Sequence, residues 1–301
     1  MNETAIDASR IDARRVRQAF QRAADSYDAA AVLQHEIADR MLERLDYIKL
    51  APRTILDAGC GTGYALEPLR RRYPPASVVA LDIAPAMLTR ARGEQTFTDR
   101  LSAALFGRSS RGAILPVCAD VARLPIRAGT LEMIWSNLTL QWCDDLPQVF
   151  TEFRHALAVD GLLMFSTFGP DTLKEMRAAF AEVDGNTHVS RFIDMHDIGD
   201  MLVQAGFGDP VMDMEIVTLT YDELERAMRD LKAIGAHNAT QGRLRGLTGK
   251  TRWQRVRAAY ERYRRDGKLP ATFEVVYGHA WKPQPWVTDD GRAIVRFDVK
   301  K

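Results

Sequence analysis

The sequence lacks long apolar runs and has little cysteine. Its 301 residues contain no stretch near the roughly 18 apolar residues of a membrane-spanning helix, so we expect no membrane partner. The three cysteines, Cys60, Cys118 and Cys143, cannot all pair and show no zinc-ligand spacing, which indicates reduced thiols and no metal. The N-terminus has no apolar run and carries Glu3, Asp7 and Asp12, unlike a secretory signal or an acid-poor transit peptide, so we expect a cytoplasmic protein.

An excess of charge of one sign is also missing over most of the chain. The formal net charge is +1, so nothing in the overall charge points to nucleic acid or a membrane. Residues 241–268 are the exception, with ten Lys or Arg against two acids. A solvated helix face is one interpretation, and a docking surface for an acidic partner is the other, because no nucleic-acid-binding motif accompanies the charge.

Apolar patterning predicts an α/β protein. Two amphipathic helices come first, and short apolar runs then alternate with helical patterns, which is typical of a parallel sheet covered on both faces. After Gly206 the pattern changes to two late strands, separated by about fifty residues of helix and loop. We therefore predict a Rossmann-like seven-stranded sheet of the class I methyltransferase type, because a dehydrogenase would continue with strand and helix units.

The predicted organisation has four parts. They are a helical cover at 1–50, a Rossmann-like core at 51–221, a helical lid insertion at 222–270, and a last strand with a tail at 271–301. The connection 93–112 is longer than the fold requires, and we interpret it as a surface excursion.

A glycine-rich loop lies between the first predicted strand and the next helix. In ILDAGCGTG, Gly59, Gly61 and Gly63 follow the strand, where glycine allows unusual dihedral angles and close approach of a ligand. The start of the following helix offers free N–H donors. The loop alone is weak evidence, because a tight turn without a ligand has the same composition.

Three aspartates at the ends of the first three predicted strands make a ligand-binding role of this loop more specific. Asp57 precedes the glycines, where a carboxylate can pair with the ammonium group of an amino acid. Asp82, with Ile83 beside it, ends the second strand and suits both hydroxyls of a ribose. Asp120 is placed for the exocyclic amine of an adenine, and Val121 for covering the ring. Together they predict S-adenosylmethionine as co-substrate.

Two alternatives stay open for this site. Asp82 and Asp120 can each be the cap of a helix or turn without any ligand. An NAD site fits two of the glycines and Asp82, but it leaves Asp57 and Asp120 without a role.

With these motifs in place, the chain resembles the class I S-adenosylmethionine-dependent methyltransferases, and more closely the malonyl-acyl-carrier-protein O-methyltransferases of biotin synthesis. The superfamily resemblance rests on ILDAGCGTG, VVALDIAPAML and CADVARLPI. The closer one rests on FQRAADSYDAAA, SNLTLQWCDDLP, FSTFGPDTLKE, HVSRFIDMHDIGDML and AMRDLKAIGAHN. The 93–112 connection and the tail after Pro285 depart from the family pattern.

The resemblance implies methyl transfer to the free carboxylate of a malonyl group held as a thioester on acyl carrier protein, or on coenzyme A. The ester hides a charge that is costly in the apolar channels of fatty acid synthesis, so the chain can be elongated towards pimelate. A carboxylate with a pKa of about 4 is already ionised at neutral pH, so no general base is needed. Positioning and exclusion of water remain as the tasks of the protein.

Several side chains are candidates for positioning the acceptor. Tyr27 is expected to close over the methionine part of the cofactor and donate its hydroxyl to the carboxylate, unless it only covers the core. Asn137 leaves the fourth strand at the ligand-binding edge, unless it only forms a turn. Gln141 and Trp142 follow beside the expected transfer point, where Trp142 excludes water or packs on a helix. Arg191 is the expected clamp of the malonyl carboxylate, with a surface ion pair as the alternative.

Other reactive side chains are interpreted as structural. Cys143 is expected to be a small buried apolar residue, because this methyl transfer needs no covalent intermediate. Ordinary hydrogen-bonded roles are expected for His188, His196 and His237, which lack metal spacing. Asp144 or Asp145, with Pro147, is expected to start the next helix.

The basic segment is predicted to dock the partner that the resemblance implies. Acyl carrier proteins are strongly acidic, so opposite charge would steer their association in a salt-sensitive way. The residues predicted for docking are Arg243, Arg245, Lys250, Arg252 and Arg255. Two other functions remain as alternatives: a hydroxylase or assembly factor of the related respiratory complex I group, and a non-catalytic S-adenosylmethionine-binding interaction protein.

Overall fold

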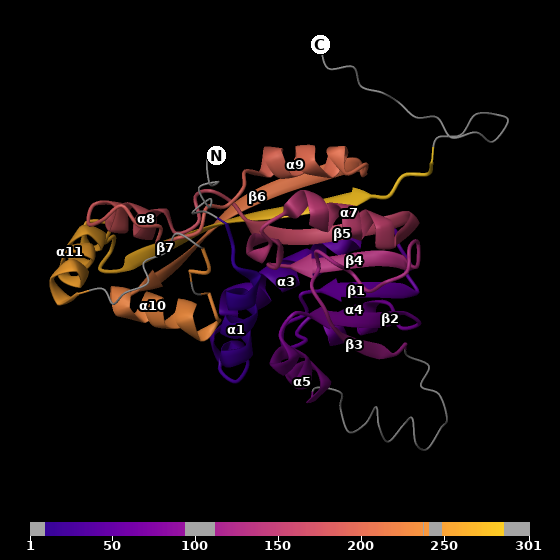
Figure 1. The fold of residues 1–301 in the computed structure, drawn as a ribbon, viewed down its shortest axis with the longest axis horizontal. Helices are drawn as coiled ribbons and strands as arrows, with labels where there is room; N and C mark the ends of the chain where they lie inside the picture. The colour runs from indigo at the N-terminus through magenta and orange to yellow at the C-terminus, as the bar shows by residue number, and fades with distance from the viewer. Residues whose placement is uncertain (1–9, 94–111, 237, 241–248, 286–301) are drawn as a thin grey trace, which may run out of the picture.

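A sheet of seven strands runs through the molecule in the order β3-β2-β1-β4-β5-β7-β6 (Figure 1). The computed structural model describes residues 10–93, 112–236, 238–240 and 249–285. The strands are β1 (Thr54–Ala58), β2 (Ser77–Asp82), β3 (Ile114–Cys118), β4 (Leu131–Asn137), β5 (Leu157–Phe168), β6 (Gly208–Tyr221) and β7 (Leu269–Trp281). The first five are parallel, and β7 is antiparallel to its neighbours β5 and β6. The predicted Rossmann-like seven-stranded sheet is confirmed.

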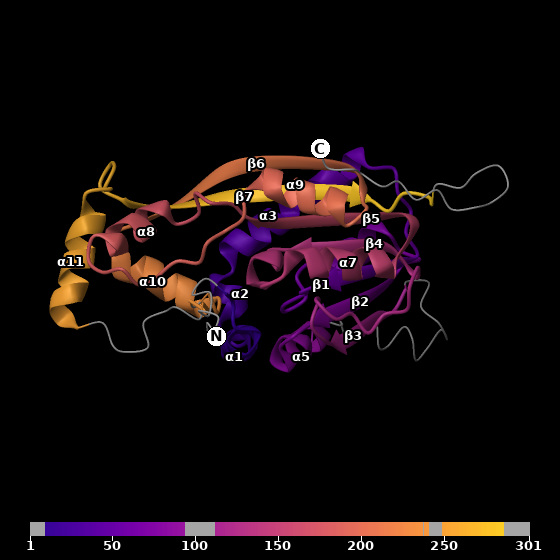
Figure 2. The same ribbon diagram turned by 45° about the horizontal axis from the view of Figure 1, so that its top comes forward.

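Helices cover both faces of this sheet (Figure 2). Strand residues on one side pack against α3, α4 and α5, and those on the other side pack against α7 and α9. Ile55 and Leu56, neighbours in β1, are both fully buried because their side chains point to opposite faces. The helices are α1 (Ala13–Ala23), α2 (Tyr27–Ala30), α3 (Val32–Arg44), α4 (Leu66–Arg72), α5 (Pro85–Gly93), α7 (Leu146–Ala156), α8 (Lys174–Ala181), α9 (Met195–Gln204), α10 (Leu224–Ala233) and α11 (Lys250–Glu261). Short 3-10 turns occupy Leu45–Tyr47 (η1) and Leu140–Trp142 (η2).

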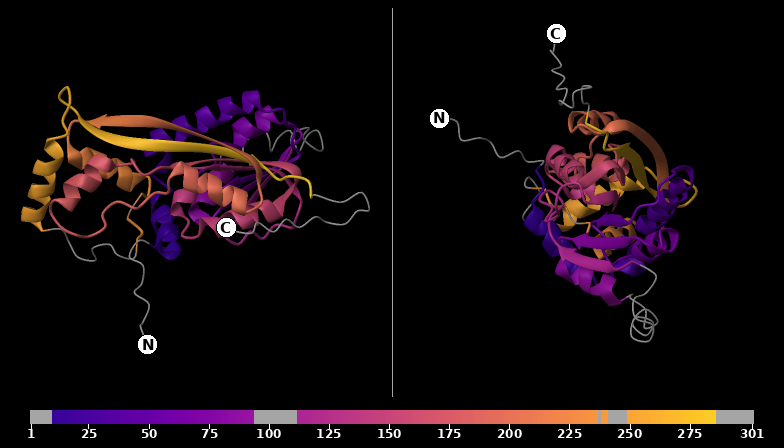
Figure 3. Two further views of the ribbon diagram at one scale, coloured as in Figure 1. Left: turned by 90° about the horizontal axis from the view of Figure 1, so that it is seen from above. Right: turned by 90° about the vertical axis from the view of Figure 1, so that its right-hand side faces the viewer.

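The last two strands reach well beyond the core sheet and carry a lobe of three helices (Figure 1, Figure 3). This lobe consists of α8, α10 and α11, and its buried residues Leu224, Val256 and Tyr260 belong to the same apolar cluster as the core. The lobe is therefore packed continuously with the sheet. The division into four parts stays a prediction, and α8 joins the helices predicted as a lid.

The structure shows two connections in more detail than the sequence pattern. Between the first two predicted helices, the polar link forms the one-turn helix α2, with Asp28 accepting a hydrogen bond from the Thr62 hydroxyl of the glycine loop. No helix joins β3 to β4, where turns cover the sheet instead. Most of the 93–112 connection and the tail from 286 lie outside the described residues.

Candidate active site

A cavity of about 850 Å³ lies at the carboxyl ends of the parallel strands, between the core and the lobe. Its volume is near the upper end of the usual range of about 300–1,000 Å³ for small-molecule sites. The core side of its wall includes Gly59, Gly61, Asp82, Ile83, Asp120 and Val121. The structure therefore brings together, on one wall, residues that the sequence assigned to a nucleoside-containing cofactor.

The glycine loop is shaped by positive φ angles. Gly59, Gly61 and Gly63 have φ of 82°, 54° and 99°, which only glycine adopts easily. A Cβ on Gly59 would lie 2.0 Å from Thr139 Oγ1, whereas one on Gly61 would meet only the Tyr27 ring, at 3.9 Å. Gly63 packs against Ala91 of α5 and does not line the cavity. Two of the three glycines thus face the ligand space, and the third lets α5 approach.

Asp82 joins the loop to the second strand. Its carboxylate accepts hydrogen bonds from the Gly61 and Ala84 N–H groups, at 3.0 and 2.7 Å, and is 8 % exposed. Burial raises the pKa of Asp82 to about 6, although these N–H groups act in the opposite direction. Each carboxylate oxygen keeps lone pairs for further donors such as ribose hydroxyls.

Two buried acceptors nearby have no donor among the described residues. Asp57 Oδ2 is one of them, and burial followed by the charge of Asp82 raises the pKa of Asp57 to about 8. Asp57 is only 2 % exposed and does not itself line the cavity. Gln34 Oε1, from α3, is the other, and Gln34 does line the cavity. Gln34 was not predicted from the sequence, because a glutamine within an amphipathic helix belongs to no motif that indicates ligand binding.

The part of the wall that was predicted to face an adenine is made by the turn after β3. Asp120 Oδ1 accepts the Ala122 N–H at 2.9 Å, which fixes the turn, and Val121 is 7 % exposed beside it. Cys143 lies near Asp120, and burial followed by that charge raises the pKa of its thiol to about 12. Such a thiol is not ionised at neutral pH, in agreement with the structural role expected for it.

The cover helices close one side of the cavity with aromatic rings. Tyr27 lies beside Gly61, and burial together with Asp82 and Asp28 raises the pKa of its hydroxyl, which stays protonated. The rings of Phe20 and Trp142 meet edge to face at 5.4 Å between centroids. Trp142 thus packs on α1 and lines the cavity as well, and its role in excluding water stays a prediction.

Asn137 and Gln141 are anchored to the surrounding backbone. Asn137 Nδ2 donates to the Gln34 carbonyl at 3.0 Å, and Oδ1 accepts from the Ser166 hydroxyl at 2.7 Å. Gln141 Nε2 donates to the Leu138 carbonyl at 2.7 Å. Both residues line the cavity, and their side chains tie α3, β5 and the loop after β4 together.

The lobe side of the cavity is largely apolar. Phe168 makes ring contacts with Phe192 at 5.9 Å and with Phe273 at 5.6 Å between centroids. Trp253 of α11 and Met228 of α10 line the same part of the cavity. These residues were not predicted from the sequence, because apolar positions look the same along the chain whether they fill a core or line a chamber.

Comparison with known proteins agrees with this site. A family model described as "Methyltransferase domain" matches residues 56–165, which include the glycine loop and the turn after β3. A protein named malonyl-acyl-carrier-protein O-methyltransferase from Gallionella capsiferriformans is 57 % identical over 96 % of this chain and 98 % of its own length. One of the same name from Laribacter hongkongensis is 58 % identical over 97 % of both chains. The chain belongs to this methyltransferase family.

Solved structures support the fold of this methyltransferase. The YcgJ protein from Bacillus subtilis matches 83 % of this chain and 99 % of its own, with a TM-score of 0.55 and 14 % identity. A putative methyltransferase from Bacillus halodurans matches 81 % of this chain and 99 % of its own, with a TM-score of 0.53 and 17 % identity.

One residue that the sequence assigned to the acceptor lies away from the methyltransferase cavity. Arg191 is exposed and does not line it, so the clamp that we predicted has no support in this geometry and stays untested. His188 does line the cavity, with its ring stacked on Phe180 and Nε2 2.8 Å from Asp184 Oδ1. The interpretation of His188 as a hydrogen-bonded histidine is confirmed.

The predicted docking residues of the methyltransferase are only partly described. Arg243 and Arg245 lie outside the described residues, as does His237. Lys250, Arg252 and Arg255 lie on α11 and do not line the cavity. Arg252 is 3.5 Å from Asp184, so one of these cations already has an acidic neighbour.

The described parts of the chain contain neither a candidate metal site nor a helix that could span a membrane. These residues contain no group of three or more His, Cys, Asp and Glu side chains that would hold a metal ion. None of the helices that the structure describes is long and apolar enough to cross a membrane.

Asp145 caps α7 by accepting the Gln148 N–H at 3.0 Å, and Pro147 lies in its first turn, as expected.

Proposed function

We propose that this chain transfers a methyl group from S-adenosylmethionine to the free carboxylate of a malonyl group, carried as a thioester on acyl carrier protein. The relatives named above are malonyl-acyl-carrier-protein O-methyltransferases and align over nearly their whole length. The observation that carries the proposal is the single cavity that joins a nucleoside-binding wall to an apolar chamber in the lobe. The hydroxylase or assembly-factor function and the non-catalytic function have no support among these relatives.

The residues present fit S-adenosylmethionine. Gly61 leaves room for close approach, and Asp82 keeps free lone pairs for two hydroxyls. Asp57 Oδ2 and Gln34 Oε1 are buried oxygens without a hydrogen-bond donor among the described residues. An ammonium group would supply them with N–H donors and a positive charge. When bound, the cofactor supplies an electrophilic methyl group.

The protein's part in the reaction is to orient the acceptor and exclude water. The malonyl carboxylate is ionised at neutral pH, so no side chain has to remove a proton. The protonated Tyr27 hydroxyl is available to donate to one carboxylate oxygen, which leaves the other free to attack. Phe20 and Trp142 close the cavity against solvent beside it.

A methyl-transfer assay tests this function. The purified protein is incubated with methyl-labelled S-adenosylmethionine and malonyl-acyl carrier protein, and we expect label in a base-labile methyl ester. Acetyl-acyl carrier protein, which has no free carboxylate, is the matched control and should take up no label. Absence of labelled ester from the malonyl substrate would overturn the proposal. If the product enters biotin synthesis, as the family resemblance implies, its methyl ester must later be hydrolysed.

A further inference from the structure

The mouth of the cavity can be located from the exposed members of its wall. Most lining residues are buried or half-buried, and the exposed ones come from only three elements. These are the start of α1, the start of α7 and one side of α10, and they supply Ala13, Asp144, Asp145, Arg229 and Lys232. Figures 1 and 2 show α1 between α10 and α5, so a thioester arm enters beside α1.

The charge around this mouth is unbalanced in favour of cations. Between residues 10 and 23, which include all of α1, there are five arginines and a single acid. The side chains of Arg14 and Arg17 are exposed and have no carboxylate partner among the described residues. The same holds for Arg229 and Lys232 on the α10 side, where Arg229 bonds only to a backbone carbonyl.

The two acids at the mouth are already engaged. Asp144 accepts hydrogen bonds from the Arg10 side chain and the Ile11 N–H, both at 2.8 Å. Asp145 accepts the Gln148 N–H as the cap of α7. They therefore offset the surrounding positive field only in part.

A second cavity enlarges the basic surface on the other face of α1. Its volume is about 300 Å³, and Arg15 and Arg22 line it. It shares Val16, Trp142 and Asn238 with the main cavity, so it lies directly beside the mouth.

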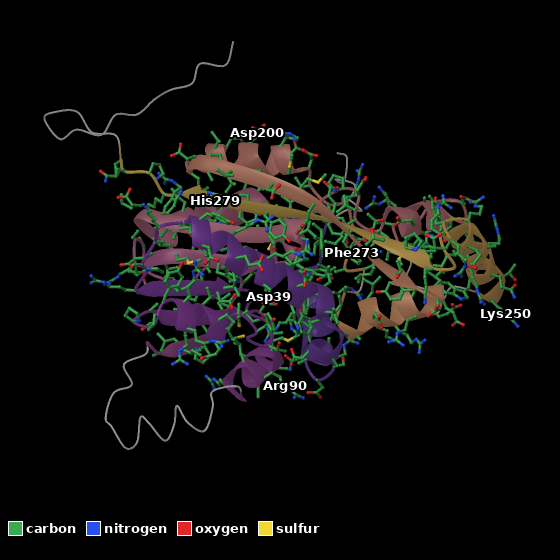
Figure 4. The ribbon with its side chains drawn as sticks, turned by 180° about the vertical axis from the view of Figure 1, so that it is seen from behind. Asp39, Arg90, Asp200, Lys250, Phe273 and His279 are labelled. Carbon is green, nitrogen blue, oxygen red and sulfur yellow. The ribbon has the colours of Figure 1, made fainter. Side chains whose placement is uncertain are left out.

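The surface of α11 is different, although this helix lies in the basic segment 241–268. Acids from neighbouring segments lie close to several of its cations: Arg252 is 3.5 Å from Asp184, and Arg257 is 3.8 Å from Glu225. Just beyond the helix, Lys268 pairs with Asp222 at 2.6 Å. Lys250 lies at the far end of the lobe, away from the core (Figure 4). The excess charge of this segment is thus partly neutralised in the fold.

We propose that the carrier protein docks on the mouth surface formed by Arg14, Arg17, Arg229 and Lys232, and not on α11. An acidic carrier helix placed there would find cations without partners, and its thioester arm would begin at the opening of the cavity. Unpaired exposed cations create the field that steers an acidic partner. Lys250 and Arg255 on α11 are also exposed and without a carboxylate partner among the described residues, but α11, unlike α1 and α10, supplies no exposed residue to the cavity wall. The inference rests on the proposed function and names the docking site that this function requires.

Two matched double variants test the docking site. Arg14→Glu with Arg17→Glu reverses charge at the mouth surface, and Lys250→Glu with Arg255→Glu makes the same change of net charge on α11. Both pairs lie in the first half of a helix, where glutamate suits the helix dipole. KM is measured for malonyl-acyl carrier protein and for malonyl-pantetheine, which carries the acyl group without the acidic protein.

The mouth variant is expected to raise KM for malonyl-acyl carrier protein by about tenfold. Its KM for malonyl-pantetheine should stay within about twofold of the wild type, since this substrate carries one carboxylate and lacks the many acids of the carrier protein that the reversed charges would repel. The α11 variant should leave both values near wild type, and salt should raise the wild-type KM only for the carrier-bound substrate. An unchanged carrier KM in the mouth variant, or a larger rise in the α11 variant, would overturn the docking site. Wild-type protein that methylates neither substrate would instead overturn the proposed function.

Discussion

At the scale of single residues, the site is distinguished by buried acceptors that lack donors. Asp57 and Asp82 lie at adjacent strand ends, and no cation among the described residues pairs with either. Burial raises the pKa of both carboxyls. The fold without cofactor therefore disfavours the ionised forms of these carboxyls, which a bound ammonium group and ribose hydroxyls would stabilise.

Asp57 should make the stability of the cofactor-free protein depend on pH. Its folded pKa is raised to about 8, above the value of about 4 in the unfolded chain, so the folded state holds the proton more tightly. The stability from the protonated form is complete below about pH 4 and is lost as pH rises to about 8. Asp57→Asn cannot ionise and should be more stable than wild type at about pH 9, by a few kcal/mol at most.

Urea unfolding without cofactor at about pH 6 and about pH 9 measures this effect. At the higher pH the same variant should bind S-adenosylmethionine more weakly than wild type, because the carboxylate is lost. An equal loss of stability with pH in wild type and Asp57→Asn would show that another group is responsible.

Gln34 should matter for the cofactor and little for the fold. Its backbone carbonyl holds Asn137, and this bond does not depend on the side chain, whose Oε1 is buried without a partner. Gln34→Leu should weaken S-adenosylmethionine binding by about tenfold, the loss of one hydrogen bond to a charged group. Gln34→Glu keeps the acceptor oxygen and is the control that should retain binding. Calorimetric titration measures the affinity of each variant for S-adenosylmethionine. Wild-type affinity in Gln34→Leu would exclude a contact between the Gln34 side chain and the cofactor.

At the scale of elements, the loop after β1 packs closely against the loop after β4. Gly59 faces Thr139 so closely that a methyl group has no room. Asn137 then links the end of β4 to α3 and β5. The position of the cover helices over the glycine loop thus depends on contacts between segments that are far apart in the chain.

Replacing Gly59 tests this contact against a matched glycine. Gly59→Ala combines a φ of 82° with a Cβ 2.0 Å from Thr139 Oγ1, and both binding and stability should fall severely. Gly129→Ala has a φ of 66° but nothing within 4 Å of the new Cβ. It should cost only about 1–2 kcal/mol from the left-handed backbone. Similar unfolding midpoints for the two variants would contradict the steric account.

At the scale of the whole molecule, β6 and β7 hold a lobe whose inner side completes the cavity. Phe192 is half-buried on this side, in contact with Phe168. Phe192→Ala should raise KM for malonyl thioesters severalfold, because the chamber loses apolar contact with the arm. Affinity for S-adenosylmethionine should stay near wild type, since the cofactor wall lies on the core side. A matching loss of cofactor affinity would contradict this division of the cavity.

The sequence was most informative where function depends on a short contiguous segment. Gly59, Gly61, Asp82 and Asp120 were predicted because a strand, its loop and the next helix fix their geometry locally, and the structure places all four on one wall. Gln34 was missed, because only the packing of α3 over the sheet turns its side chain into the cavity. Arg191 was chosen for its chemistry, but the loop before α9 leaves its side chain exposed.

The sequence by itself determined the class of the sheet and the cofactor half of the site, since both follow from local periodicity and from motifs within a few residues. Only the tertiary structure decided the acceptor half. It brings Asp184 to Arg252 and Glu225 to Arg257, so the segment with the largest charge in the sequence is partly neutralised. It also leaves Arg14 and Arg17 exposed on α1, beside the cavity wall and with no carboxylate partner among the described residues. The physical reason is that the field of a charge depends on its neighbours in space, which composition along the chain does not specify.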